Sequence, residues 1–348
     1  ENDQNDSKTF LTLGYIYFDN ILVPIDIKKS IHYFKLAADQ GETESLKKLM
    51  QIYWNGLYIE RDINKGIYYL SLMAEKGDAK AQYFLGCVYI QNMEVRPNID
   101  KAIYYFKLAV EHDFFAANYL LGKLYLQKGE ITKSIKYLTF AANNNDQAAQ
   151  YLLGKIYSKD KYHNLNINKA IKYFMQLANN SICPSLAQYQ LGKLYSRSKY
   201  INHDFKKAIY YYTLAANQNN VKSQYHLGKL YFNKENNFYD ITKSIFYLSL
   251  AADNNDEVNS QYILGLIYLE NKYVYDIKKA IRYFTLAANH DHLSAQEMLG
   301  SIYSDNKYLS MNIEFAVHYL SLAAKKNSPF AQALLGSIYL KGDCAKQN

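Results

Sequence analysis

Tyrosine and lysine recur four residues apart at four places in the middle of the chain. The pairs are Tyr119 and Lys123, Tyr151 and Lys155, Tyr189 and Lys193, and Tyr225 and Lys229. Residues four apart project from the same side of a helix. A tyrosine ring offers rigid contact area with a hydroxyl group, and lysine attracts negative charge. The pattern therefore predicts a basic, aromatic groove that binds an extended or acidic peptide.

The same residues allow a structural interpretation, in which each tyrosine covers a neighbouring helix and each lysine is simply solvated. In the repeats before and after these four, the position of the lysine is uncharged: Cys87 stands four residues after Tyr83, and Leu266 stands four residues after Tyr262. A glutamine or asparagine precedes these tyrosines and could hold a peptide backbone. It also persists where the lysines stop, which favours a structural link between repeats.

Catalytic chemistry is not indicated by any motif. The sequence has no phosphate loop, no nucleophile motif and no recurring pair of carboxylates. His290 and His292 flank Asp291, but the sequence offers no further ligands for a metal there. We therefore predict a protein that is not an enzyme and that uses no cofactor and no metal.

The composition limits the class of partner and the compartment. The net charge of +8 is spread along the chain, which argues against nucleic acid. Cys87, Cys183 and Cys344 give neither a disulfide framework nor zinc spacing, so we expect a reducing, cytoplasmic location. No apolar run reaches the roughly 18 residues of a membrane helix, so no membrane insertion is expected. The chain begins without methionine, and we expect it to be part of a longer polypeptide.

A Leu-Gly-x-x-Tyr segment repeats along the whole chain at intervals of 32 to 38 residues. A small residue stands five positions before each glycine, and a tyrosine stands three after it. This spacing defines one face of a helix, and the glycine predicts close approach of a neighbouring helix. The glycines are Gly14, Gly86, Gly122, Gly154, Gly192, Gly228, Gly265, Gly300 and Gly336, with Met50 in the second copy.

A second segment, of the form small-Ile-x-Tyr-x-x-x-Ala-Ala, follows each of the first nine copies and also has helical spacing. We predict that the tyrosines and the alanine pairs of both segments are core residues. In eight of the nine copies Gly, Asn or Asp stands three residues beyond the second alanine position, from Gly41 to Asn327, as expected where a left-handed residue ends a helix, and the fifth copy has Ser181 there. Asn, Asp and Gly, including Gly56 and Asn271, predict the same signature between the two helices.

These helices predict an all-α fold, a right-handed α-α superhelix (solenoid) of about ten two-helix repeats in a single array over residues 1–348. The last repeat lacks its second helix. The step from Gly122 to Gly154 is short because residues are missing from the loop at Gln127 to Glu130, and an insertion lies near 180–185. The repeats are expected to start near residues 7, 43, 79, 115, 147, 185, 221, 258, 293 and 329.

The repeat resembles the Sel-1-like repeat, a relative of the tetratricopeptide repeat. The third copy shows the resemblance best, with Ala81, Leu85, Gly86 and Tyr89 followed by an Asp100-Lys101-Ala102 segment. It covers essentially the whole chain, although the paired glycines usual in the inter-helix loop are mostly Asn, Lys or Asp. By analogy with tetratricopeptide arrays, the first helices would line a concave surface, and the four Tyr/Lys pairs would lie on it.

The resemblance implies a protein-protein interaction scaffold or adaptor in signalling. Two alternatives stay open: an endoplasmic-reticulum quality-control adaptor, weakly favoured by sequons at Asn5 and Asn179, and the non-catalytic repeat region of a larger enzyme such as a kinase. The partner is expected to be a protein or peptide and not nucleic acid. An uncapped helix face in the tenth copy also predicts a homodimer formed through that end.

Overall fold

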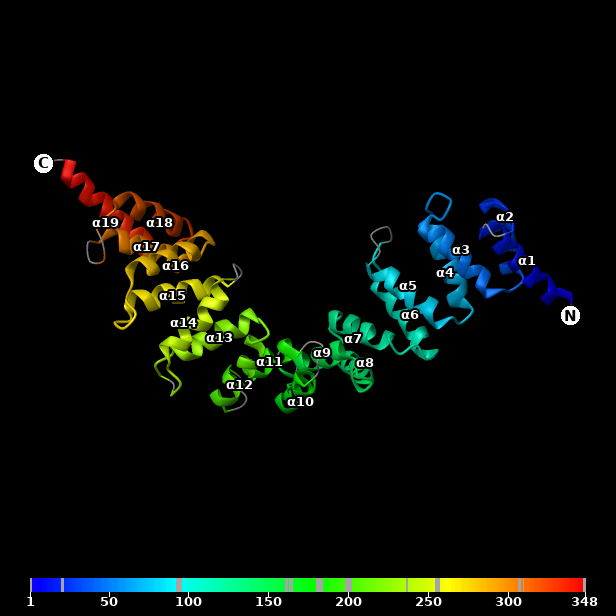
Figure 1. Cartoon of the computed structure of the whole chain (residues 1–348), viewed down its shortest axis with the longest axis horizontal. Helices are drawn as coiled ribbons and strands as arrows, with labels where there is room; N and C mark the ends of the chain where they lie inside the picture. The colour runs from blue at the N-terminus through cyan, green and yellow to red at the C-terminus, as the bar shows by residue number, and fades with distance from the viewer. Residues whose placement is uncertain are drawn as a thin grey trace. The chain divides into compact units, whose positions relative to one another are not determined.

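The computed structural model describes residues 2–19, 22–91, 96–159, 162, 165–179, 184–197, 202–235, 237–253, 257–305, 308 and 310–346. Within these ranges the chain forms nineteen α-helices and no strand, which confirms the predicted all-α repeat fold (Figure 1). The first helices of the repeats are α1 (Asn2–Phe18), α3 (Thr43–Asn55), α5 (Ala79–Gln91), α7 (Ala117–Gln127), α9 (Gln147–Tyr157), α11 (Pro184–Arg197), α13 (Val221–Phe232), α15 (Val258–Glu270), α17 (Leu293–Ser304) and α19 (Pro329–Lys346). The second helices are α2 (Ile27–Asp39), α4 (Ile63–Glu75), α6 (Ile99–Glu111), α8 (Ile131–Asn143), α10 (Ile167–Ala178), α12 (Phe205–Ala216), α14 (Ile241–Ala252), α16 (Ile277–Asn289) and α18 (Ile313–Lys325).

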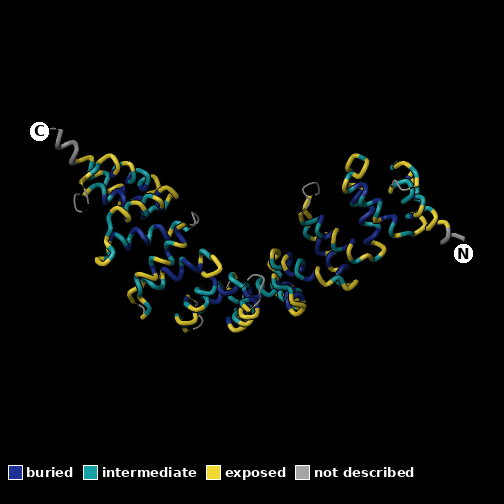
Figure 2. Tube along the Cα trace, viewed as in Figure 1, coloured by how far each residue is buried: buried dark blue, intermediate teal, exposed yellow. Residues whose placement is uncertain are grey.

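The chain divides into two compact units, an N-terminal unit over Glu1–Leu165 and a C-terminal unit over Asn166–Asn348. In each unit, the two helices of a repeat pack against each other, and the second helix packs on the first helix of the next repeat. Buried residues follow the inner sides of the helices, and exposed residues concentrate in turns and on outer sides (Figure 2). Each repeat thus relies on its neighbour to cover its apolar stripe.

The repeated glycine allows the two helices of a repeat to touch. A Cβ atom added to Gly86 would lie 2.5 Å from the ring of Phe106, which is fully buried. The same contact joins Gly122 to Leu138 in the next repeat, also at 2.5 Å. The hydroxyl of Ser134 donates a hydrogen bond to the carbonyl of Gly122. The close helix approach predicted from the glycine spacing is confirmed.

The two tyrosines of a repeat stack on each other instead of filling the centre of the core. In eight repeats their rings lie 5.5 to 6.2 Å apart and within 13° of parallel. Most of these rings are half-buried, and Tyr339 is exposed, so the prediction that all of them are core residues is wrong. The central position belongs to the residue after the second tyrosine, such as Phe34 or Phe106, which is 0 % exposed.

In seven of the eight tyrosine stacks a lysine at the start of the second helix lies against the ring of the first tyrosine, and in α18 Phe315 takes this position. In α6, Asn98 caps the helix by accepting a hydrogen bond from the amide of Lys101 at 3.0 Å. The ammonium group of Lys101 lies 5.1 Å from the centre of the Tyr89 ring. In α14, Asp240 caps in the same way and also forms a 3.2 Å ion pair with Lys243. An Asp or Asn three residues before the lysine therefore starts the helix, and the lysine places a cation over the aromatic stack.

Left-handed residues follow seven of the nine second helices as the sequence predicts, and the equivalent Ser181 and Asn255 lie outside the described residues. Asp113, Asn145, Asn219, Asp291 and Asn327 all have φ between 59° and 62°. These are residue types that tolerate this conformation at modest cost.

The loops between first and second helices follow the sequence only in part. Between α7 and α8 the loop is reduced to 128–130, which confirms the predicted deletion. Gly56 is left-handed as expected, with φ of 68°. Asn271 is extended, with φ of −85°, so the prediction of the same signature there is wrong. The predicted insertion near 180–185 lies largely outside the described residues.

Candidate functional site

One cavity of the N-terminal unit is lined by three of the residues that the sequence singles out. Tyr119 and Lys123 of α7 and Tyr151 of α9 line a space of about 830 Å³, which we call the basic cavity. The ammonium group of Lys155 lies 5.7 Å from the centre of the Tyr151 ring, so the fourth predicted residue stands beside the cavity. Two consecutive first helices thus place their Tyr/Lys pairs around one opening.

Tyr119 and Tyr151 are half-buried and also line the basic cavity, so a bound segment can contact them. Tyr119 is half-buried, and burial, followed by the charge of Asp146, raises the pKa of its phenol. The hydroxyl group is therefore protonated at neutral pH and can donate a hydrogen bond. Apolar wall is supplied by Leu126, Ile131 and Leu152. The cavity offers apolar contact, tyrosine hydroxyl groups and positive charge to a single bound segment.

In the C-terminal unit, the predicted pairs are arranged differently. Tyr189 of α11 stacks on His226 with ring centres 5.8 Å apart and an angle of 5°. Lys193 of α11 and Lys229 of α13 carry exposed side chains, and Tyr225 is half-buried against the core. Of these four residues only Lys229 lines the cavity of about 650 Å³ in this unit. We call this second space the arginine cavity, because Arg197 forms part of its wall.

Residues that sequence reasoning missed make up the rest of the arginine cavity. Besides Lys229 it is lined by Ser196, Arg197, Tyr212 and His226. Tyr212 is fully buried, at a repeat position where the other repeats have Phe or Leu. This tyrosine is the sequence feature that could have indicated the cavity, because a buried hydroxyl group requires a polar partner nearby. That partner is Ser196, whose Oγ lies 3.0 Å from the Tyr212 hydroxyl.

The glutamine before the tyrosine links consecutive repeats. The amide of Gln82 donates a 2.9 Å hydrogen bond to the carbonyl of Ala74, at the end of the preceding second helix. Gln150, Gln224, Gln261 and Gln296 donate to the equivalent carbonyls at 3.2 to 3.3 Å. Their side chains are buried or half-buried, so these glutamines act as structural links between repeats, as one of the two interpretations of the sequence expects.

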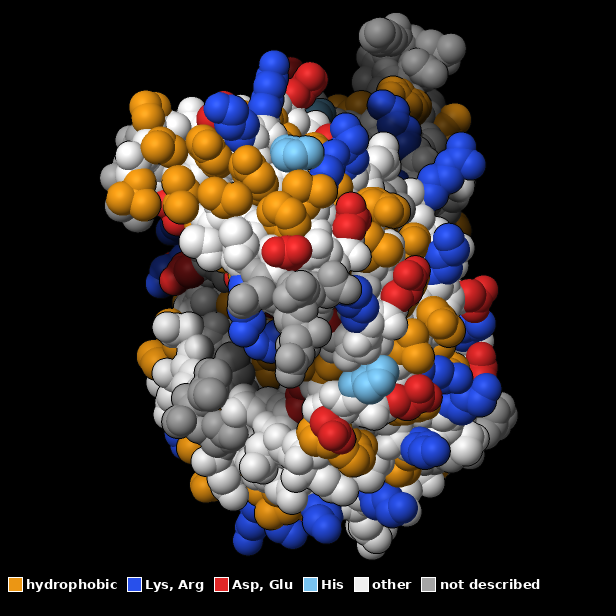
Figure 3. Space-filling view, turned by 90° about the vertical axis from the view of Figure 1, so that its right-hand side faces the viewer, with side chains coloured by type: hydrophobic (Ala, Val, Ile, Leu, Met, Phe, Trp, Pro, Cys, Tyr) orange, Lys and Arg blue, Asp and Glu red, His pale blue; other side chains and the backbone are white. Residues whose placement is uncertain are grey.

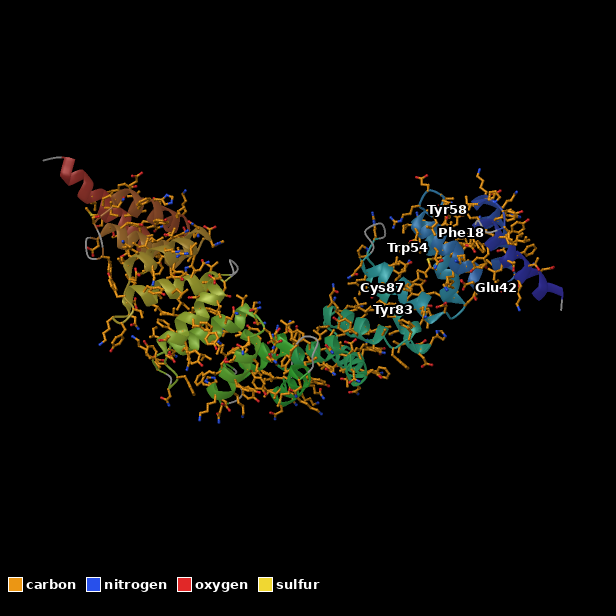
Figure 4. All side chains as sticks on the ribbon, viewed as in Figure 1. Phe18, Glu42, Trp54, Tyr58, Tyr83 and Cys87 are labelled. Atoms are coloured by element: carbon orange, nitrogen blue, oxygen red, sulfur yellow. The ribbon has the colours of Figure 1, made fainter. Side chains whose placement is uncertain are left out.

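A third, mainly apolar cavity of about 470 Å³ lies between α3 and α5 of the N-terminal unit. It is lined by Met50, Trp54, Phe84 and Cys87, among others, and Figure 4 shows Trp54 and Cys87 on these helices. Burial raises the pKa of the Cys87 thiol, and a hydrogen bond with Tyr83 only partly opposes this. Cys87 is therefore a protonated, half-buried thiol in an apolar wall.

A metal site is not formed by the described residues, in which no group of three or more His, Cys, Asp or Glu side chains converges. His292 instead caps α17 by accepting a hydrogen bond from the amide of Ala295, and its ring stacks on Tyr262 at 4.6 Å. Basic and acidic side chains are interspersed over the face seen in Figure 3. No helix in the described part of the chain has the length and apolar character needed to cross a membrane.

The tenth copy presents an uncovered face. A Cβ added to Gly336 of α19 would meet no atom within 4 Å, whereas the equivalent atoms in seven other repeats would strike a second helix at 2.5 Å. Phe330, Tyr339 and Leu340 on this helix are more than half exposed. The predicted homodimer through this face stays a prediction.

The helix pairs, the repeated glycine contact and the left-handed turns define a protein of the α-helical repeat class. The sequence pattern of the Sel1 repeat matches ten times, and the chain belongs to this family of typically non-catalytic protein-interaction scaffolds. The matches cover residues 13–42, 51–78, 79–114, 115–146, 147–181, 185–220, 221–256, 258–292, 293–328 and 329–348.

Solved structures agree with this assignment. A Sel1 repeat protein from Oxalobacter formigenes is 25% identical, with a TM-score of 0.71 over 88% of this chain and 90% of that chain. The Escherichia coli protein c5321, described as a protective antigen displaying an SLR fold, is 23% identical, with a TM-score of 0.66 over 98% of this chain and 73% of that chain. No curated protein matches the chain.

Proposed function

We propose that the protein is an interaction scaffold whose first helices bind acidic, extended polypeptide segments. The observation that carries this proposal is the basic cavity, where Tyr119, Lys123 and Tyr151 line one opening and Lys155 stands beside it. Acidic side chains would approach the two lysines, and the peptide backbone would lie against the two tyrosine rings. Such electrostatic complementarity favours fast association and selection against basic partners.

In the C-terminal unit, Lys193 and Lys229 offer a second place for acidic side chains. Both side chains are exposed on first helices, and Lys229 lines the arginine cavity. Each unit is thus proposed to engage an acidic stretch by itself. A partner that presents two such stretches would gain affinity from their linkage.

The test uses a labelled peptide of about 12 residues rich in Asp and Glu, which spans about 40 Å when extended. Fluorescence anisotropy measures its binding to the full chain, and a peptide with Asn and Gln in place of the acids controls for charge. We expect K123E/K155E to weaken binding about tenfold or more, because each substitution replaces attraction by repulsion. The matched variant K107E/K136E, which changes exposed lysines of second helices in the same unit, should bind nearly normally.

The proposal also predicts that K155E/K193E, with one substitution in each unit, weakens binding strongly. Binding should fall as salt is raised, since exposed charges are screened over about 8 Å at physiological ionic strength. Equal affinity of the chain for the acidic and the neutral peptide, or equal loss in K107E/K136E, would contradict the proposal.

A further inference from the structure

The arginine cavity brings together polar side chains that the repeat pattern does not require. Arg197 stands five residues after the repeat glycine, and no other repeat has arginine at this position. At the position of Tyr212 the other repeats have Phe or Leu, and at the position of His226 no other repeat has histidine. All three, with Ser196 and Lys229, line the same space of about 650 Å³. Because these three residues depart from the repeat pattern and line the same cavity, we treat this cavity as a candidate binding site.

The cavity carries an excess of positive charge. Arg197, Lys229 and Lys234 line it, together with a single acid, Glu235. Among the described residues, no acidic side chain forms an ion pair with Arg197 or Lys229. Both residues are exposed. Guanidinium and ammonium groups around a cavity are the usual partners of carboxylate and phosphate.

His226 adds a polar atom that has no hydrogen-bond partner among the described residues. The side chain is 9 % exposed, and its Nδ1 is buried without a hydrogen bond among the described residues. Its Nε2 lies 3.5 Å from the Tyr189 hydroxyl. Burial, followed by the charges of Arg197 and Lys229, lowers the pKa of His226 to about 3. The imidazole is therefore neutral at physiological pH, and the positive charge of the cavity resides on Arg197 and the lysines.

We propose that the arginine cavity binds an oxyanion carried by a side chain of the bound polypeptide, a carboxylate or a phosphoryl group. Arg197 and Lys229 neutralise the charge, and the neutral His226 forms part of the polar wall. The apolar part of the wall, with Phe205, Leu230 and Phe232, holds the carbon chain of that residue. The proposal rests on the proposed function in one respect, that the oxyanion is carried by a polypeptide. The cavity itself lies wholly within the C-terminal unit and does not depend on the basic cavity.

The test observes the histidine ring by NMR in the full chain labelled with ¹⁵N-histidine. The resonance that disappears in H226L is that of His226, and leucine occupies this position in the repeats of Leu120 and Leu152. Inorganic phosphate and N-acetylglutamate are titrated separately at constant ionic strength. We expect a saturable change at His226 with at least one probe. In R197Q/K229Q the dissociation constant should rise about tenfold or more, because two charged hydrogen-bond donors are lost.

The matched control is K278Q/R282Q, which removes one lysine and one arginine from exposed positions of α16 in the same unit. It should leave the titration unchanged. Tighter binding of phosphate assigns the site to a phosphorylated side chain, and binding of N-acetylglutamate as tight or tighter assigns it to Asp or Glu. Circular dichroism checks the helical content of every variant, and K229Q alone replaces the double variant if that one loses helicity.

Two results would overturn the proposal. The first is the absence of any saturable change at His226 with both probes. The second is the same change in the wild type and in the variant without Arg197 and Lys229, which would indicate unspecific screening. Because phosphate and N-acetylglutamate are not peptides, binding of either one would stand even if the acidic peptide failed to bind to the basic cavity.

Discussion

Tyr89 and Tyr105 lie face to face, with ring centres 5.8 Å apart and planes within 4° of parallel. One ring comes from α5 and the other from α6, so the stack joins the two helices of one repeat. Lys101 lies 5.1 Å from the centre of the Tyr89 ring on the same edge of the repeat. The arrangement recurs through both units, which makes the tyrosine stack a fixed part of the helix pair and leaves the central core to Phe or Leu, and to Tyr212 in one repeat.

This stack predicts a measurable coupling between the two tyrosines. Y89L and Y105L should each lower the free energy of unfolding, and the double variant should lose less than the sum of the two. The expected coupling is about 0.5–1.5 kcal/mol, as for other aromatic pairs. Urea unfolding of the four proteins measures it. Y104L changes an exposed ring on the same helix and, combined with Y89L, should show no coupling.

The glycine contact predicts opposite effects at two equivalent positions. G86A should lower the free energy of unfolding by about 1–2 kcal/mol, because overpacking against Phe106 outweighs the gain of roughly 1 kcal/mol in helix propensity. G336A meets no neighbouring atom, so only the gain in propensity remains there. Thermal unfolding measures the first effect, and slower hydrogen exchange of amides in α19 measures the second. Stabilisation by G86A would contradict the role assigned to the glycine.

The buried histidine predicts a dependence of stability on pH. The pKa of His226 is about 3 in the folded chain, below its ordinary value of 6.5, so the unfolded chain takes up a proton first as the pH falls. The neutral ring stabilises the fold fully above pH 6.5, and this stability is lost as the pH falls from 6.5 towards 3. The slope is up to about 1.4 kcal/mol per pH unit.

The measurement compares wild type with H226L by urea unfolding at pH 7 and at pH 4.5. The wild type should lose more stability between the two values than the leucine variant, which lacks this titrating group. His292, whose pKa burial also lowers, remains in both proteins and cancels in the comparison. Equal losses in the two proteins would show that His226 is protonated without cost.

The apolar cavity predicts a slowly reacting thiol. Burial raises the pKa of Cys87, and the thiolate is the reactive form, so alkylation by iodoacetamide at pH 8 should be slower than in the unfolded chain. Mass spectrometry follows the reaction in a C183S/C344S background, in which Cys87 is the one remaining cysteine. Replacing Tyr83 by Phe removes the hydrogen bond that favours the thiolate and should slow the reaction further. Faster alkylation in Y83F would contradict this account.

Local features of the fold could be predicted from the sequence because each depends on a few neighbouring residues. The left-handed conformation of Asn145 follows from its residue type and its distance from the alanine pair. The approach of Phe106 to Gly86 follows from a glycine placed on the buried side of a helix. Periodicity alone could not separate Tyr105 from Phe106, because both fall on the apolar side and only packing decides which one is central.

The candidate sites were predictable only in part, because a cavity depends on what surrounds a helix face. Tyr119, Lys123 and Tyr151 line one opening, as their spacing indicates. The pair Tyr189 and Lys193 has the same spacing, yet the neighbouring His226 stacks on the tyrosine ring, and neither member of the pair lines the arginine cavity. A side chain from the next repeat thus changes the environment of a residue without any change in its own helix.

The glutamine bond from Gln82 to the carbonyl of Ala74 has a mechanical consequence. It joins the last turn of one repeat to the first helix of the next. The bond lies in the interface between the two repeats, and this interface must separate before one repeat can unfold without the other. Pulling the chain from its two ends would therefore load these bonds in sequence, and repeats that share such a bond should come apart in one step instead of two. Such bonds join six pairs of consecutive repeats in the described chain, so the array should behave under tension as blocks of several repeats, with length released in multiples of the repeat.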